Sequence, residues 1–209
     1  MVRLLLLGDS HIPKRATEVP IDIYSKIKEI LEDTLFDYTF FTGDLINAPK
    51  LMRFLKKITK NEILRVIGNM DYYGGDRDLP LFRDLHISLN RDDDLSLGLI
   101  HGHNIHPRGD HNQLESFALD NNYNILVSGH THKEEIYLTQ NGVLLLNPGS
   151  ITGAWSFIAT QNNAFITLKI NEQSKDISTK LFQKSRNTTK FSIKNFYFLY
   201  VNKSIRNKY

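Results

Sequence analysis

Five apolar segments of this chain each run directly into a polar tip rich in aspartate, asparagine or histidine. An apolar segment that ends in this way is typical of a buried strand with functional side chains at its carboxyl end. Because parallel strands end at the same edge of a sheet, we expect the tips to gather on one rim. The segments and their tips are 4–7 into 8–11, 38–41 into 43–44, 63–67 into 68–71, 97–100 into 101–103, and 123–127 into 128–132.

Strand and helix patterns alternate in the N-terminal half. Apolar residues follow helical spacing over 23–33, and again over 51–58 after Pro49. Strands that alternate with helices predict a mainly parallel sheet covered by helices.

From about residue 81 short strands dominate, with one helix predicted over 112–121. Asn141-Gly142 and Asn162-Asn163 are typical of hairpin turns. This half should form a second sheet on the first, which gives an α/β fold arranged as a helix–sheet–sheet–helix sandwich of four layers. The strands are predicted near 85–89, 95–101, 124–128, 134–139, 142–146, 155–159 and 163–170.

We expect one domain over 1–185, followed by a basic, aromatic tail over 186–209. The tail includes the aromatic run Phe196-Tyr197-Phe198, and no acidic residue follows Asp176. Two interpretations are open, an edge strand with a solvated end or a contact with nucleic acid. We favour the edge strand, because a formal charge of +3 for the whole chain does not by itself indicate a nucleic-acid partner.

Composition narrows the class of protein. The 209 residues, 41% hydrophobic and 23% charged, are ordinary for a globular domain with a sizeable core. No apolar run approaches the ~18 residues that a membrane span needs. The apolar start is cut off by Gly8-Asp9, so a first strand is expected rather than a signal peptide. The sequence has no cysteine, which excludes disulfides and thiolate ligands and suits the cytoplasm.

The tips supply a mixed set of oxygen and nitrogen ligands. Asp9 and His11 could chelate one ion, Asp44 could bridge two, and Asn69 offers an amide oxygen. Two ions roughly 3.5–4 Å apart would clamp a phosphate and hold a hydroxide nucleophile. The donor set favours two divalent ions of Mn, Fe, Zn, Co or Ni. The nitrogen ligands would be His101, His130 and His132.

Each tip alone has a simpler explanation. Gly-Asp after a strand often forms only a turn or a helix cap. His103 could face a substrate or lie in a turn, and His86, His106 and His111 have no motif partner and are expected at ordinary surface positions. The coincidence of five tips on five strands favours the metal centre.

Together the motifs over about 2–170 resemble the signature of the calcineurin-like metallophosphoesterases. The chain is most similar to the small single-domain branch, which contains bacterial and archaeal phosphodiesterases and the retromer subunit vacuolar protein sorting 29. The motifs that carry the resemblance are Gly8-Asp9-Ser10-His11, Gly43-Asp44, Gly68-Asn69-x-Asp71, His101-Gly102-His103, Gly129-His130-Thr131-His132 and Asn147-Pro148-Gly149-Ser150.

The resemblance implies a role for each motif residue. Asp9, His11 and His132 would hold the first metal, Asp44 would bridge, and Asn69 would join the second. The remaining ligands of the second metal would be His101 and His130. The implied reaction is hydrolysis of a phosphodiester, with Asp9, Asp44, Asn69 and His103 as the catalytic residues.

Two departures from the family pattern matter. Met70 stands where the enzymes have a histidine that assists the leaving group, and a thioether cannot donate a proton. His103 is a candidate to replace it in part. In the animal retromer subunit, which acts mainly as a scaffold, asparagine and aspartate are exchanged at the positions of Asp44 and Asn69. Here both keep the arrangement of the enzymes.

A scaffold that binds a helical-repeat coat protein is therefore the alternative function. A scaffold needs an exposed apolar patch larger than the few hundred Å² common on monomers. The same side chains could instead grip an organic substrate. The residues expected in exposed loops are Ile12, Pro13, Tyr72, Tyr73, Ile105, Pro107, Ile151 and Trp155.

Overall fold

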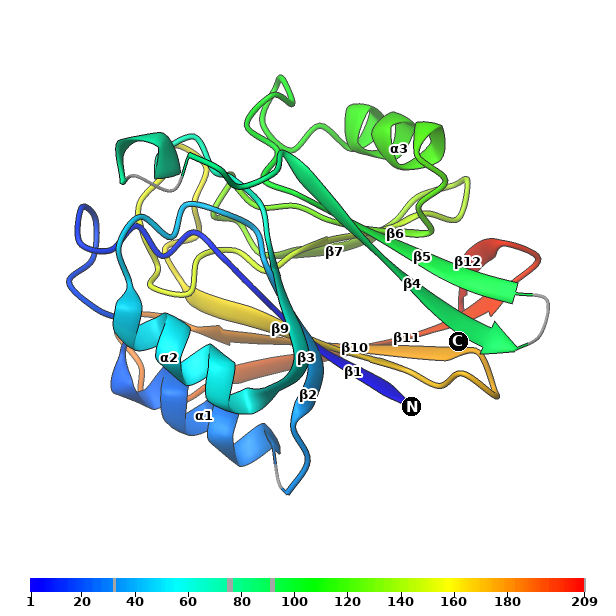
Figure 1. Cartoon of the computed structure of the whole chain (residues 1–209), viewed down its shortest axis with the longest axis horizontal. Helices are drawn as coiled ribbons and strands as arrows, with labels where there is room; N and C mark the ends of the chain where they lie inside the picture. Colours follow the sequence, from blue (N-terminus) through cyan, green and yellow to red (C-terminus); the bar gives the residue numbers. More distant parts are fainter. Residues whose placement is uncertain (32, 75–76, 91–92, 209) are drawn as a thin grey trace.

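The computed structural model describes residues 1–31, 33–74, 77–90 and 93–208. Within these ranges the strands form one sheet of seven and one of five. The sheets pack face to face with helices on both outer sides, so the molecule has four layers (Figure 1). The predicted α/β sandwich is confirmed.

The seven-stranded sheet has the order β12-β11-β10-β9-β1-β2-β3. Its strands β1, β2 and β3 are parallel to one another, and the strands on the other side of β1 continue antiparallel. The bounds are β1 (Val2–Leu7), β2 (Phe36–Phe41), β3 (Thr59–Arg65), β9 (Asn163–Ile170), β10 (Asp176–Lys184), β11 (Ser192–Val201) and β12 (Ser204–Asn207).

The five-stranded sheet has the order β4-β5-β6-β8-β7. Its centre, β5, β6 and β8, is parallel, so both sheets have parallel strands whose carboxyl ends can carry a site. The bounds are β4 (Phe82–Asn90), β5 (Asp93–Ile100), β6 (Ile125–Val127), β7 (Glu135–Leu138) and β8 (Leu144–Asn147).

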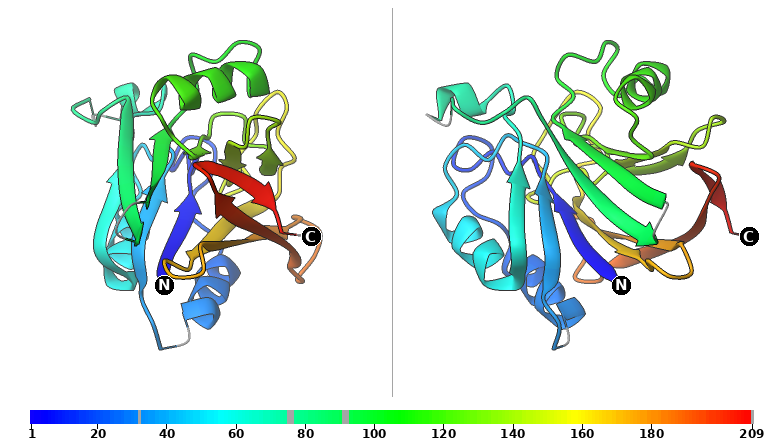
Figure 2. Two further views of the ribbon diagram at one scale, coloured as in Figure 1. Left: turned by 90° about the vertical axis from the view of Figure 1, so that its right-hand side faces the viewer. Right: turned by 45° about the vertical axis from the view of Figure 1, so that its right-hand side comes forward.

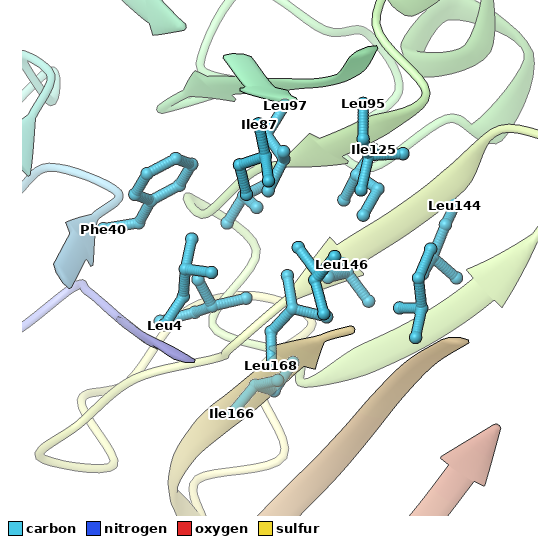
Figure 3. Packing of buried hydrophobic residues seen from close by; sticks show 14 of the residues in the cluster. Leu4, Phe40, Ile87, Leu95, Leu97, Ile125, Leu144, Leu146, Ile166 and Leu168 are labelled. Carbon is cyan, nitrogen blue, oxygen red and sulfur yellow. The ribbon is translucent and has the colours of Figure 1, made fainter. Parts of the chain in front are cut away.

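Strand β1 shows how the layers are built. Leu4 and Leu6 face the second sheet, while Leu5 and Leu7 face the outer helices, because successive side chains of a strand point to opposite faces. Figure 3 shows side chains of the layer between the sheets packed together, among them Phe40. Every leucine of this strand is therefore buried, and the continuous apolar run is explained.

Three helices complete the outer layers, α1 (Ile21–Leu31), α2 (Pro49–Ile58) and α3 (His111–Asp120). The first two cover the seven-stranded sheet and α3 covers the five-stranded sheet (Figure 1). In α2 the residues Leu51, Leu55 and Ile58 recur at helical spacing and are buried. Asp110 caps α3 by accepting a hydrogen bond from the backbone N–H of Gln113, at 2.9 Å.

Two expectations about the C-terminal half are wrong. The segment 155–159, predicted as a strand, is a loop, so Asn162-Asn163 is not a hairpin turn and Asn163 begins β9. Apolar composition suggested a strand there, but the loop is held at the end of the sandwich by bonds to the site described below. Strand β10 was not predicted, although its residues alternate in burial from Asp176 to Leu181 as in a half-buried strand. The hairpin at Asn141-Gly142 is confirmed between β7 and β8.

The segment 186–209 contributes β11 and β12 to the seven-stranded sheet, with β12 at its edge. Figure 2 shows this hairpin curling toward the other sheet. The backbone N–H of Ile205 donates to the carbonyl of Gly142, at 2.9 Å.

No helix among the described residues is both long enough and apolar enough to cross a bilayer.

Candidate metal centre

The five polar tips lie at the carboxyl ends of β1, β2, β3, β5 and β6 and meet at one end of the sandwich (Figure 1). Backbone hydrogen bonds join them. The N–H of Asp9 donates to the carbonyl of Gly43 at 3.0 Å, and the N–H of Gly129 donates to that of His101 at 3.0 Å. The predicted rim is therefore one connected set of loops.

The backbone of these tips is strained. Asp9, His11, Asp44, His130 and His132 all have positive φ, between 48° and 66°. This left-handed conformation is costly for residues other than glycine and persists only where surrounding contacts enforce it. Residues held in this way cluster at functional sites, because strain fixes a side-chain direction that relaxed backbone would not give.

Asp9, His11 and His132 form the first of two buried groups whose ligand atoms lie within 4.8 Å of one another. The Nε2 atoms of His11 and His132 are 2.9 Å apart. Asp9 Oδ1 lies 3.3 Å from His132 Nε2 and 3.9 Å from His11 Nε2. Three ligand atoms thus face a common point.

Asp9, Asp44 and His101 form the second group. Asp44 Oδ2 lies 3.3 Å from His11 Nε2 and 3.5 Å from His101 Nε2. Asn69 Oδ1 is 3.2 Å from the same nitrogen of His101. Asp9 is common to both groups, and Asp44 of the second group also approaches His11 of the first, so both carboxylates link the two groups.

Hydrogen bonds set the proton positions of two histidines. Nδ1 of His132 lies 2.8 Å from the carbonyl oxygen of Ala154, and Nδ1 of His101 lies 2.7 Å from that of Thr42. A carbonyl can only accept, so each Nδ1 donates, and a neutral ring in this tautomer keeps the lone pair of Nε2 for a cation. This is the arrangement that a metal-binding imidazole needs. Burial opposes a charge on His132, but the Asp9 carboxylate outweighs it and raises the pKa of this ring.

Burial and mutual charge set the pKa values. Burial lowers the pKa of His11 and that of His130 to about 3, so both are neutral at pH 7. Burial raises the pKa of Asp44 to about 6, and the negative charge of Asp9 adds to the shift. Burial alone would raise the pKa of Asp9, but the imidazoles of His132, His101 and His11 outweigh it and lower the value. Asp9 is therefore ionised.

Three observations indicate that this set fits divalent cations. Asp9 Oδ1 is buried and has no hydrogen-bond partner among the described residues. A Cβ at Gly68 would lie 2.1 Å from Asp44 Oδ1, so the glycine leaves room for that oxygen. Carboxylate oxygens combined with imidazole nitrogens suit zinc, manganese and iron.

His130 and His103 lie beside these groups. The backbone N–H of His130 donates to Asp9 Oδ2 at 3.1 Å, and its ring centroid is 5.0 Å from that of His101. The half-buried ring of His103 is 5.5 Å from that of His101, and burial lowers its pKa. The other histidines lie elsewhere: His86 pairs with Asp84 and His111 with Glu135, each at 3.0 Å.

Asp71 is a supporting residue to which the sequence assigned no role. Its buried carboxylate accepts hydrogen bonds from the backbone N–H groups of Asp44, Ile46 and Gly68, at 2.8, 2.9 and 2.8 Å. It thereby joins the second tip to the third. Its position in the 68–71 tip indicated that Asp71 lies near the centre. The residue type alone, however, does not distinguish an aspartate that accepts backbone N–H groups from one that binds a metal.

The Asn147-Pro148-Gly149-Ser150 loop also supports the centre. Ser150 Oγ donates to the carbonyl of Asp9 at 2.7 Å. Asn147 Nδ2 donates to the carbonyl of Gly129 at 3.1 Å. The loop thus positions the first and last tips.

The residues expected in an exposed patch divide into two sets. Ile12, Ile105 and Ile151 are buried, so the expectation was wrong for them: Ile12 and Ile151 pack under α1 and α2, and Ile105 under α3. The exposed set is Pro13, Tyr72, Tyr73, Pro107 and Trp155.

Comparisons with known proteins agree with this geometry. The family described as "Calcineurin-like phosphoesterase superfamily domain" matches residues 2–173. A protein of Methanothermobacter thermautotrophicus described as "Probable metallophosphoesterase" is 33% identical over 147 residues, which cover 70% of this chain and 76% of the relative.

Two solved structures are also similar. Vacuolar protein sorting 29 from Cryptosporidium parvum is 29% identical, with a TM-score of 0.75 over 93% of this chain and 97% of that one. Wild-type Vps29 from Entamoeba histolytica, complexed with zinc, is 26% identical, with a TM-score of 0.76 over 93% and 99%.

Proposed function

The chain belongs to the calcineurin-like phosphoesterase superfamily, and on that premise we propose that it is a phosphodiesterase dependent on two divalent metal ions. The observation that carries the proposal is the position of Asp44 Oδ2, 3.3 Å from a nitrogen of His11 and 3.5 Å from one of His101. A single carboxylate oxygen that near to both groups suits a shared ligand.

In this proposal Asp9, His11 and His132 hold one ion, and Asn69, His101 and His130 hold the other. Asp44 serves both. When bound, two such ions supply the Lewis acidity that activates water and neutralises charge on a phosphate. Mn, Zn, Ni, Co and Fe are the candidates that suit these ligands.

The chain's own residues act on the proton and the leaving group. His103 is neutral at pH 7, because burial lowers its pKa, and it retains one N–H. We assign this N–H to a hydrogen bond with the ester oxygens. Met70 has no proton to donate and gives its backbone N–H to Asp44 Oδ1, at 2.7 Å. With little acid assistance, esters with good leaving groups should react best.

The test is turnover of bis(p-nitrophenyl) phosphate and of p-nitrophenyl phosphate, with Mn, Ni, Co, Zn and Mg in turn. We expect the diester to be hydrolysed faster with at least one transition metal. Asp9→Asn should abolish this activity, and His86→Ala, a histidine outside the centre, should retain it. Absence of turnover for both esters with all five metals would contradict the proposal.

A second function is supported by the Vps29 structures, which are 26–29% identical over 93% of the chain. In this alternative the protein is a scaffold subunit and its partner is a helical-repeat coat protein. The exposed aromatic residues Tyr72 and Tyr73 are then candidate contacts. If the protein is a scaffold, Tyr73→Asp should abolish binding of that partner and Asp9→Asn should leave it intact. If the protein is an enzyme, Asp9→Asn should abolish turnover. For either function we propose the cytoplasm, which suits a sequence without cysteine.

A further inference from the structure

The loop that follows the Asn-Pro-Gly-Ser turn holds large apolar side chains in water. Trp155 is 51% exposed and Phe157 is 79% exposed, and Ile158 lies beside them in the sequence. The rings of Trp155 and Phe157 are 5.0 Å apart at an interplanar angle of 61°. A cluster of exposed aromatic rings is more informative than a single exposed apolar residue, because it indicates a surface that binds something.

Hydrogen bonds hold this loop against the metal centre. The carbonyl of Ala154 accepts from His132 Nδ1 at 2.8 Å, and the N–H of Ala154 donates to Ser150 Oγ at 2.9 Å. Trp155 directly follows Ala154, whose carbonyl oxygen orients the candidate metal ligand His132. A molecule at the centre would therefore have aromatic surface close by.

Two arginines approach the loop from other segments. Arg15 Nη1 donates to the carbonyl of Trp155 at 2.8 Å. Arg108 Nη1 donates to Ser156 Oγ at 3.3 Å, and its Cζ lies 5.5 Å from the centroid of the Phe157 ring. The loop therefore brings together two guanidinium groups and two aromatic rings.

Both arginines belong to segments that adjoin the centre. The backbone N–H of Arg15 donates to the carbonyl of His11 at 2.8 Å, and Arg108 lines a pocket together with Ser128 and Thr131, which flank the last tip. Across the part of the chain that the structure describes, neither guanidinium pairs with a carboxylate. A guanidinium has five N–H donors, so each can still bind an anion.

We propose that Trp155, Phe157, Arg15 and Arg108 form a subsite for a nucleotide, with the base against the rings and its phosphate near the guanidinium groups. This rests on the proposed function and narrows its substrates to phosphodiesters of nucleosides. A base offers a flat π face that stacks on aromatic rings and on arginine. Its phosphate supplies the negative charge that unpaired arginines bind.

The chain has one tryptophan, so tryptophan emission, excited at a wavelength that tyrosine does not absorb, reports on this loop alone. AMP, titrated in the presence of zinc, should quench the emission of Trp155, because a base that approaches the indole changes its surroundings. Ribose 5-phosphate, which has the phosphate without the base, should bind at least about tenfold more weakly. No quenching by AMP, or equal affinity for the two ligands, would overturn the proposal.

Variants locate the binding. Phe157→Ala keeps the tryptophan and removes an exposed ring, and it should raise the Kd for AMP about tenfold. Arg108→Ala should raise it by a similar factor. The matched control is Tyr197→Ala, a ring 52% exposed on β11, and it should leave the Kd unchanged. Unchanged affinity in both Phe157→Ala and Arg108→Ala would also overturn the assignment and would favour a protein as the occupant of this surface.

Turnover separates the subsite from the chemistry. The p-nitrophenyl ester of thymidine 5′-phosphate and methyl p-nitrophenyl phosphate share a leaving group, but the first carries a nucleoside where the second carries a methyl group. Their ratio of kcat/KM should favour the thymidine ester and fall about tenfold in Phe157→Ala. A further outcome is that neither ester reacts while AMP still binds and Phe157→Ala still weakens the binding of AMP. That result would support the nucleotide subsite and contradict the proposed hydrolysis.

Discussion

The Nε2 atoms of His11 and His132 face each other across 2.9 Å in the interior of the protein. His132 donates through Nδ1 to the carbonyl of Ala154, so the neutral form of the ring has its lone pair on Nε2. His11 Nδ1 is buried with no hydrogen-bond partner among the described residues. These two nitrogens meet beside the Asp9 carboxylate, at the place where the first of the two proposed ions would be held.

Metal stoichiometry tests this arrangement. We expect the reconstituted protein to hold two divalent ions per chain, measured by elemental analysis after gel filtration. Asp44→Ala should weaken both sites, because only a bridging ligand touches both ions. His86→Ala is the control and should keep two. Loss of only one ion from Asp44→Ala, with the other at its original affinity, would show that Asp44 does not bridge.

Metal affinity should depend on pH. Burial raises the pKa of Asp44 to about 6 in the metal-free site, so this carboxyl is ionised at pH 7 and largely protonated at pH 5. A ligand must lose its proton to bind, so the Kd for zinc should rise as the pH falls through 6, by up to about tenfold per pH unit. Calorimetric titrations at pH 5, 6 and 7 measure this. Asp44→Asn, which has no such proton, should show a flatter dependence.

Leaving groups should reveal the effect of Met70. Met70→His restores an imidazole next to Asn69, and a general acid contributes about 10²–10⁴-fold. The gain in kcat/KM should be larger for alkyl esters than for p-nitrophenyl esters, because a poor leaving group needs the proton more. Met70→Leu is the control of similar size and should give no gain. Equal gains for both ester types would argue against a role in protonation.

Stability should depend strongly on Asp71. Asp71→Ala removes the acceptor of the backbone N–H groups of Asp44, Ile46 and Gly68, and each unsatisfied buried group costs about 1–3 kcal/mol. The free energy of unfolding of the metal-free protein should therefore fall by about 3 kcal/mol or more, measured in urea. Asp120→Ala, an exposed carboxylate on α3, should change it by less than about 0.5 kcal/mol.

The polar tips and the strands that lead into them could be predicted from the sequence, because both are local patterns. The run Leu4–Leu7 can only be a strand buried on two faces, and Asp9 follows it at once. The loop 155–159 could not be predicted, because its apolar residues resemble a strand. Only the contacts of Ala154 and Arg15 explain why it stays a loop with its rings in water.

Side-chain roles divide in the same way. The sequence by itself determined which residue types stand at the strand ends, since an apolar run into Asp, Asn or His is a local feature. Tertiary structure alone decided that Asp44 lies between His11 and His101 while Asp71 binds backbone N–H groups. Both are aspartates in polar tips. Their difference depends on which groups lie next to each carboxylate, and those groups come from segments as far as 57 residues away in the sequence, as His101 is from Asp44.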